Sequence, residues 1–174
     1  MSNIFFASDT HLGHENILTF LRKDNGLRLR DFSTIEEHNE TIINNWNSVV
    51  HPNDIVYHCG DVVFAPATNC HLISRLNGKK RLTLGNHDYA NLLYKYLTVF
   101  QRVSSIVEFD GGVVSHIPVH TSQLEGRWKF NIHGHLHDTV LDDDRYLNVC
   151  MENINFTPVS YDILKRYMND SIRE

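Results

Sequence analysis

The chain has 174 residues, of which 41% are hydrophobic and 21% are charged. This length suits one domain with a buried core, and the composition excludes an intrinsically disordered chain. The 16 Lys and Arg residues against 21 Asp and Glu give a formal charge of -5, which argues against a surface built to hold long nucleic acid by neutralising its phosphates.

The N-terminal apolar stretch, residues 4–7, is too short for a membrane span and lacks the basic flank of a signal peptide. We therefore expect no membrane association and a cytoplasmic location. The three cysteines, Cys59, Cys70 and Cys150, are odd in number and widely spaced, which predicts reduced thiols rather than disulfides or a thiolate metal site. The oligomeric state is left open.

Strands and helices alternate in the first half of the chain. The first predicted strand covers residues 4–7, and a capping box formed by Ser33 and Glu36 predicts a helix over residues 33–46. A strand over 55–57, a helix over 67–76 that ends near Gly78, a strand over 81–84 and a helix over 89–97 follow. This order is typical of an α/β domain.

The second half is richer in predicted strands. Asp110, Gly111 and Gly112 separate apolar residues 103–109 from a strand at 113–114, which is a hairpin pattern. Another strand covers 130–132, and a last helix covers 161–168. The whole pattern predicts one α/β domain over residues 1–174, a sandwich with a mixed rather than fully parallel sheet.

Polar side chains follow the predicted strands in an ordered series. Because residues at strand ends converge on one edge of an α/β sheet, five separate segments are expected to meet there. The segments are Asp9-Thr10-His11, Gly60-Asp61, Gly85-Asn86-His87-Asp88, Ser115-His116 and Gly134-His135-Leu136-His137.

These carboxylates, imidazoles and the amide are a ligand set for two divalent ions. Alternate residues of an extended segment point the same way, so Asp9 with His11, and His135 with His137, should each approach the ions from one side if they are locally extended. Each short motif alone is more often a solvated loop. Only their joint occurrence, each at a strand end, supports a metal centre.

The series D-x-H, G-D, G-N-H-D, a lone His and G-H-x-H resembles the signature of the calcineurin-like metallophosphoesterases, in particular the small single-domain branch. The resemblance spans residues 9–137. It implies a sandwich of mixed β-sheets flanked by helices. It also implies one ion held by Asp9, His11, Asp61 and His137, and a second held by Asp61, Asn86, His116 and His135, so that the carboxylate of Asp61 bridges both ions.

By the same resemblance, His87 faces the leaving group as the catalytic acid. Family members often carry an Asp three residues after the bridging one, which orients the catalytic imidazole, but this chain has Phe64 there. The partner that orients His87 is therefore open. The missing Arg-Gly after that position, and Asp88 in place of Glu, argue against a Ser/Thr protein phosphatase.

Other residues carry weaker expectations. His14 either contacts substrate or is a surface histidine, and Arg30 either binds a phosphate oxygen or, as we favour, is a solvated loop arginine. His133 is expected to support the ligands without binding metal, and His58 to be an inner histidine. Three more are assigned to the surface or to a helix: His38, His51 and His71.

The resemblance implies hydrolysis of a small phosphoester substrate by a hydroxide formed between two ions about 3.5–4 Å apart. Mn is the expected metal, with Fe or Zn as alternatives. Small or cyclic phosphodiesters are favoured because so short a chain leaves no separate cap for a monoester. The alternatives are a nuclease, a phosphomonoesterase, or a non-catalytic interaction scaffold, against which the intact ligand set and His87 argue.

Overall fold

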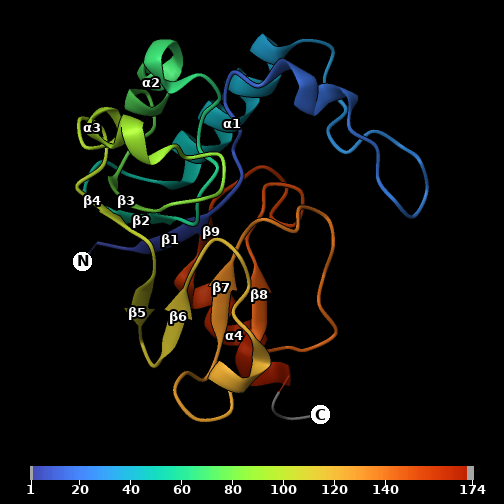
Figure 1. Cartoon of the computed structure of the whole chain (residues 1–174), viewed down its shortest axis with the longest axis vertical. Coiled ribbons are helices and arrows are strands. Elements are labelled where there is room, and N and C mark those ends of the chain that lie inside the picture. Colours follow the sequence, from blue (N-terminus) through green and yellow to red (C-terminus); the bar gives the residue numbers. More distant parts are fainter. Residues whose placement is uncertain (1, 172–174) are drawn as a thin grey trace.

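The computed structural model describes residues 2–171, which form two β-sheets with helices around them (Figure 1). The five-stranded sheet has the order β4-β3-β2-β1-β9. Its strands are β1 (Ile4–Ala7), β2 (Ile55–His58), β3 (Lys79–Thr83), β4 (Arg102–Ser104) and β9 (Val159–Ser160). Strands β1 to β4 pair in parallel, whereas β9 joins β1 antiparallel.

The second sheet has the order β5-β6-β7-β8 and lies below the first in Figure 1. Its strands are β5 (Val107–Phe109), β6 (Gly112–Val114), β7 (Asn131–His133) and β8 (Tyr146–Asn148). The β5–β6 pair is antiparallel, and the other two pairs are parallel. Both sheets together make the predicted mixed sandwich.

Helices cover the outer face of the five-stranded sheet and flank the four-stranded one. They are α1 (Ile35–Val49), α2 (Pro66–Ser74), α3 (Leu93–Tyr96) and α4 (Tyr161–Ser171), with short 3₁₀ turns η1 (Glu15–Thr19), η2 (Ala90–Leu92) and η3 (Thr121–Gln123). Figure 1 shows α1 to α3 above the first sheet and α4 beside β7 and β8. No helix within residues 2–171 has the length and apolar character that crossing a membrane requires.

Two hydrophobic cores hold these layers together. Along β1, Phe5 and Ala7 face the core beneath α1 to α3, while Phe6 faces the core between the sheets. This alternation follows from the two-residue period of a strand. The second core also contains Ile132 of β7 and Leu164 of α4, so it joins both sheets to the last helix.

Helix boundaries differ from the predictions by a few residues. Helix α1 begins at Ile35, because the side chain of Thr34 caps it by accepting a hydrogen bond from the amide of Glu37 at 3.1 Å. The predicted capping pair, Ser33 and Glu36, is therefore wrong by one residue. The helix predicted over residues 89–97 is divided into η2 and α3.

The later strands depart further from the predictions. Residues 103–109 form no single strand, since β4 and β5 belong to different sheets. The predicted hairpin is confirmed, with positive φ at Asp110 and Gly111 between β5 and β6. The β6–β7 and β7–β8 pairs are parallel rather than hairpins, and β8 and β9 were not predicted.

Candidate metal centre

The loops after several strands are joined to one another at the C-terminal edge of the sheets. Beyond the ends of β1 and β2, the amide of Asp9 donates to the Gly60 carbonyl at 2.9 Å, and the amide of His11 donates to the Asp61 carbonyl at 3.1 Å. The amide of His135 donates to Asp9 Oδ2 at 2.9 Å, across 126 residues of sequence. The strand-end segments therefore meet, as the sequence predicts.

Several residues of these loops adopt a left-handed backbone rather than an extended one. The φ angles are positive at Asp9 (56°), His11 (45°), Asp61 (55°), His135 (69°) and His137 (50°). The expected local extension is therefore wrong. Such conformations cost a non-glycine residue of order 1–3 kcal/mol each, and they concentrate at functional sites.

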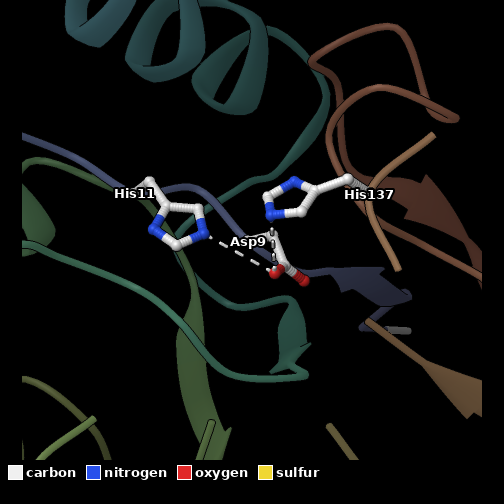
Figure 2. Close-up of side chains that lie close together, drawn as sticks. All are labelled: Asp9, His11 and His137. Carbon is white, nitrogen blue, oxygen red and sulfur yellow. Dashed lines mark ion pairs between the residues drawn. The ribbon is translucent and has the colours of Figure 1, made fainter. Parts of the chain in front are cut away.

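One group of ligand atoms surrounds the carboxylate of Asp9, as Figure 2 shows. His11 Nε2 lies 3.6 Å and His137 Nε2 lies 4.0 Å from Asp9 Oδ1. Both imidazoles point toward that oxygen (Figure 2). Asp9 Oδ1 and His11 Nε2 are buried and have no hydrogen-bond partner among the described residues, although such groups are normally satisfied.

A second group lies around Asn86 and His116. His116 Nε2 is 2.8 Å from Asn86 Oδ1 and 3.4 Å from Asp61 Oδ2, and His135 Nδ1 is 2.9 Å from the same Asn86 oxygen. Asp61 Oδ2 also lies 3.9 Å from His11 Nε2. This one carboxylate oxygen is therefore common to both groups.

The arrangement fits divalent ions. Ligand atoms about 2.1 Å from an ion lie about 3–3.5 Å from each other. The 3.4 Å between His116 and Asp61 falls in that range, and the 3.6 Å between His11 and Asp9 is close to it. The residues offer imidazole nitrogens, carboxylate oxygens and an amide oxygen, a set that suits first-row metals. The two candidate ligand groups found among the described residues are Asp9, His11 and His137, and Asp9, Asp61 and His116.

The local charges keep the two carboxylates ionised. Burial alone would raise the pKa of Asp9, but its contact with His11 and the nearby His116 and His137 hold that pKa well below its usual range. Burial also opposes ionisation of Asp61, while the hydrogen bond and the charge of His116 lower its pKa. Both side chains are therefore in the form that binds cations.

A buried ion pair between Glu152 and Arg30 contacts the side of the His137 ring that faces away from Asp9. Glu152 Oε1 lies 3.1 Å from His137 Nδ1 and accepts a hydrogen bond from Arg30 Nε at 2.8 Å. Burial would raise the pKa of Glu152, but Arg30 and His137 lower it to about 2. Glu152 thus fixes the ring of His137 so that Nε2 faces Asp9, an arrangement common behind metal-binding histidines.

Arg30 is buried in the structure, unlike the exposed loop residue that we expected. Its side chain is fully buried, and its guanidinium donates to the backbone carbonyls of Asp9 and Thr10 as well as to Glu152. The preferred expectation of a solvated loop arginine is wrong. A contact with substrate phosphate also disagrees with this buried position, and Arg30 instead holds the loop after β1.

Asp88 holds the loop after β2. Its carboxylate accepts hydrogen bonds from the amides of Asp61 at 2.8 Å, Gly85 at 2.8 Å and Val62 at 3.2 Å. The position of Asp88 directly after His87, within a strand-end motif, is the sequence signal for this supporting role. Glu152 belongs to no motif, so the sequence carried no signal for it.

Two glycines allow the loops to approach one another closely. A Cβ atom at Gly85 would overlap the carboxylate of Asp61, and one at Gly134 would overlap the side chains of Ser8 and Asp9. Both positions therefore need a residue without a side chain.

His87 lies at the open side of the centre. Its side chain is exposed, its ring centroid is 5.8 Å from that of His11, and its amide donates to Asp61 Oδ1 at 2.8 Å. Phe64 stacks on His14 at 4.5 Å between ring centroids, and His14 lies 5.5 Å from His11. Within residues 2–171 the His87 ring makes no hydrogen bond, and its ring contact is with His11.

The remaining histidines mostly lie as expected. His58 is a buried inner residue whose Nε2 lies 3.0 Å from Thr10 Oγ1. His133 lies on β7, and its Nδ1 donates to the Gly134 carbonyl at 2.9 Å. His51 and His71 are exposed. His38 lies on α1 but is buried against Arg30, at 2.9 Å, and not at the surface.

Comparisons with known proteins identify the family of the chain. The family model of the calcineurin-like phosphoesterases matches residues 2–171. An uncharacterised protein of Methanocaldococcus jannaschii is 33% identical over 177 residues, covering 94% of this chain and 90% of that protein. The gene 66 protein of Mycobacterium phage L5 is 30% identical, covering 81% of this chain and 80% of the phage protein.

A solved structure shows the same fold. The crystal structure of a protein of unknown function from Aquifex aeolicus aligns with a TM-score of 0.71 at 22% identity, covering 95% of this chain and 99% of that one. The family match over residues 2–171 and the archaeal relative extend over almost all of the chain. The chain belongs to the calcineurin-like phosphoesterase family.

Proposed function

We propose that the chain is a dinuclear metal-dependent phosphodiesterase that acts on small, including cyclic, phosphodiesters. The observation that carries the proposal is the position of Asp61 Oδ2, which lies 3.9 Å from His11 Nε2 on one side and 3.4 Å from His116 Nε2 on the other. One ion would be held by Asp9, His11, Asp61 and His137. The other would be held by Asp61, Asn86, His116 and His135.

Mn²⁺ is our choice of metal, with Fe or Zn as alternatives, because the ligands are nitrogen and oxygen atoms. The nearby Cys150 thiol donates to Asp9 Oδ2 at 3.2 Å, and burial raises its pKa well above the usual value. It therefore remains a thiol and adds no soft thiolate ligand. Bound together, two such ions supply Lewis-acid activation of a water molecule and of the phosphoryl group.

The protein's own groups complete the chemistry. His87, exposed beside His11, would carry on a ring nitrogen the proton that the leaving oxygen needs. His14 borders the same side and would contact the substrate, with its ring held flat against Phe64. Asp9 and Asp61, kept ionised, would hold the cations that neutralise the phosphate.

The openness of the centre favours diesters. Asn86 and His87 are exposed, and His135 and His137 are half-buried, so the second ester group of a diester can extend away from the ions. A monoester has no second ester group to place on this open side. Its remaining phosphoryl oxygens instead need hydrogen-bond donors that surround them.

The test compares bis(p-nitrophenyl) phosphate with p-nitrophenyl phosphate, after adding Mn²⁺, Fe²⁺ or Zn²⁺ separately to chelator-treated protein. We expect activity to return best with Mn²⁺ and kcat/KM to be higher for the diester. A higher kcat/KM for the monoester at matched metal occupancy would reverse the assignment of substrate class.

A further inference from the structure

A cavity with both polar and apolar side chains in its lining lies away from the candidate metal centre. It has a volume of about 210 Å³ and occupies the corner where the chain passes from β4 to β5. Figure 1 shows that corner at the edge shared by the two sheets. The polar lining comes from Tyr57, Arg81, Thr83, Arg102 and Ser104, and none of the proposed metal ligands takes part.

Strand register brings these side chains to one face. Tyr57 of β2 pairs with Arg81 of β3, which pairs with Arg102 of β4. Thr83 pairs with Ser104 in the same way. Paired residues of neighbouring strands, and residues two apart on one strand, point to the same side of a sheet, so the five polar groups line one surface.

The cavity is strongly cationic. The two arginines stand directly opposite each other, an arrangement that is destabilising unless something neutralises it. Arg81 Nη1 donates to the hydroxyl of Tyr57 at 2.5 Å, and Arg81 Cζ lies 5.2 Å from the centre of that ring. Neither Arg81 nor Arg102 has an ion pair within residues 2–171, and no carboxylate lines the cavity.

Two buried polar groups in the lining lack partners. Thr83 is 1% exposed, and its Oγ1 has no hydrogen-bond partner among the described residues. The same holds for Arg81 Nε, which is also buried. Buried donors are almost always satisfied, so both point to a ligand that brings acceptor atoms.

We propose that this cavity is a binding site for a phosphate-class oxyanion, held by the guanidinium groups of Arg81 and Arg102 and by the hydroxyl of Thr83. Forked guanidinium donors match the oxygens of a phosphate, and Thr83 Oγ1 and Arg81 Nε supply the unused donors. The volume is below the roughly 300–1,000 Å³ of sites for drug-sized ligands, which favours free phosphate over a nucleotide. The site is separate from the metal centre.

Inorganic phosphate binding, measured by isothermal titration calorimetry at constant ionic strength, tests the proposal. The full chain is used in metal-loaded form and in chelator-treated form, so that phosphate bound at the metals is counted separately. The test variant is Arg102→Gln, which changes an exposed residue and so preserves the fold. Arg127→Gln is the matched control, since Arg127 is also exposed but pairs with Glu108 outside the cavity.

Chelator-treated wild type and Arg127→Gln should each bind one phosphate per chain. Arg102→Gln should bind it about tenfold more weakly, as expected for the loss of a charge-assisted contact. Thr83→Val, which keeps the strand residue branched, should also weaken binding. The proposal is overturned if chelation abolishes all phosphate binding, or if Arg102→Gln binds within about twofold of the control.

Discussion

The two oxygens of Asp61 have different partners. Oδ1 accepts the amide of His87 at 2.8 Å, whereas Oδ2 faces both His11 and His116. In the proposed centre, a single oxygen of Asp61 would therefore be the ligand shared by the two ions. The hydrogen bond from the backbone amide of His87 to Oδ1 orients the carboxylate so that Oδ2 points between the two groups of candidate ligands.

Asp61→Asn should be the most damaging ligand substitution. The amide carries less charge than the carboxylate, and only this residue would serve both ions. We expect fewer than two metal ions per chain by elemental analysis, with the loss of most activity on bis(p-nitrophenyl) phosphate. Asp31→Asn, at an exposed carboxylate, is the control and should keep both ions. Two ions still bound to Asp61→Asn would remove the bridging role.

His87→Ala tests the proposed acid. The variant should keep two metals but lose roughly 10²–10⁴-fold in kcat/KM on a diester with an alkyl leaving group. The loss should be clearly smaller on a nitrophenyl ester, because nitrophenolate leaves without a proton. With Phe64 in place of an orienting Asp, we expect the lower end of that range. Equal losses on both esters would mean that His87 positions phosphate or supports the metals.

Glu152→Gln tests the support behind His137. The substitution leaves the buried Arg30 without a counter-charge, so the free energy of unfolding should fall by about 3–5 kcal/mol. Metal affinity should fall about 10–100-fold, because a neutral amide oxygen orients and polarises the His137 ring more weakly than the Glu152 carboxylate does. Glu40→Gln, at an exposed pair with Arg75, should change neither quantity. Unchanged metal affinity in Glu152→Gln would leave Glu152 a purely structural role.

At the scale of elements, the loops after the strands set the site. The backbone amide of Asp9 donates a hydrogen bond to the loop after β2. Asp88, in the loop after β3, accepts a hydrogen bond from the amide of Asp61. These hydrogen bonds hold the left-handed backbone at the candidate ligand residues in place. Displacing one of these loops would therefore move candidate ligands of both proposed ions.

Gly85→Ala should disrupt the centre through this loop contact. The added Cβ would overlap the carboxylate of Asp61, so the loops after β2 and β3 must separate. We expect weaker metal binding and a lower melting temperature. At Gly126 an added Cβ meets nothing within 4 Å, so Gly126→Ala is the matched control and should behave as wild type. Equal metal affinity in the two variants would contradict the close approach of these loops.

The elements could be predicted from the sequence where their patterns are local. Strand β1 and the loop motifs after it are contiguous, so residues 4–11 could be interpreted directly. Strand β9 has two residues, too few to carry an alternating pattern. The change of sheet between β4 and β5 interrupts no apolar pattern, which is why residues 103–109 suggested a single strand.

The supporting side chains of the site were harder to predict, because they come from distant parts of the chain. Glu152 meets Arg30 across 122 residues, and no local pattern encodes that contact. Arg30 lies in a loop between η1 and α1, where an arginine is normally solvated, so only the fold shows that it is buried. A supporting role for Asp88 could be predicted from the sequence, because Asp88 directly follows the motif residue His87.

At the scale of the whole molecule, the candidate metal centre depends on both sheets. Asp9, Asp61 and Asn86 follow strands of the five-stranded sheet, while His116 and His135 follow strands of the four-stranded sheet. The core between the sheets, with Phe6 and Ile132, fixes the spacing of these two sets. Ions that bind only the folded chain would therefore also hold the sheets together and stabilise it.

The most direct measurement is turnover of bis(p-nitrophenyl) phosphate by chelator-treated protein as Mn²⁺ is added, with bound metal counted in the same samples. A dinuclear hydrolase should show no turnover without metal and reach its plateau at two ions per chain. Full turnover in excess chelator with no bound metal, or a plateau at one ion per chain, would contradict the proposed dinuclear centre.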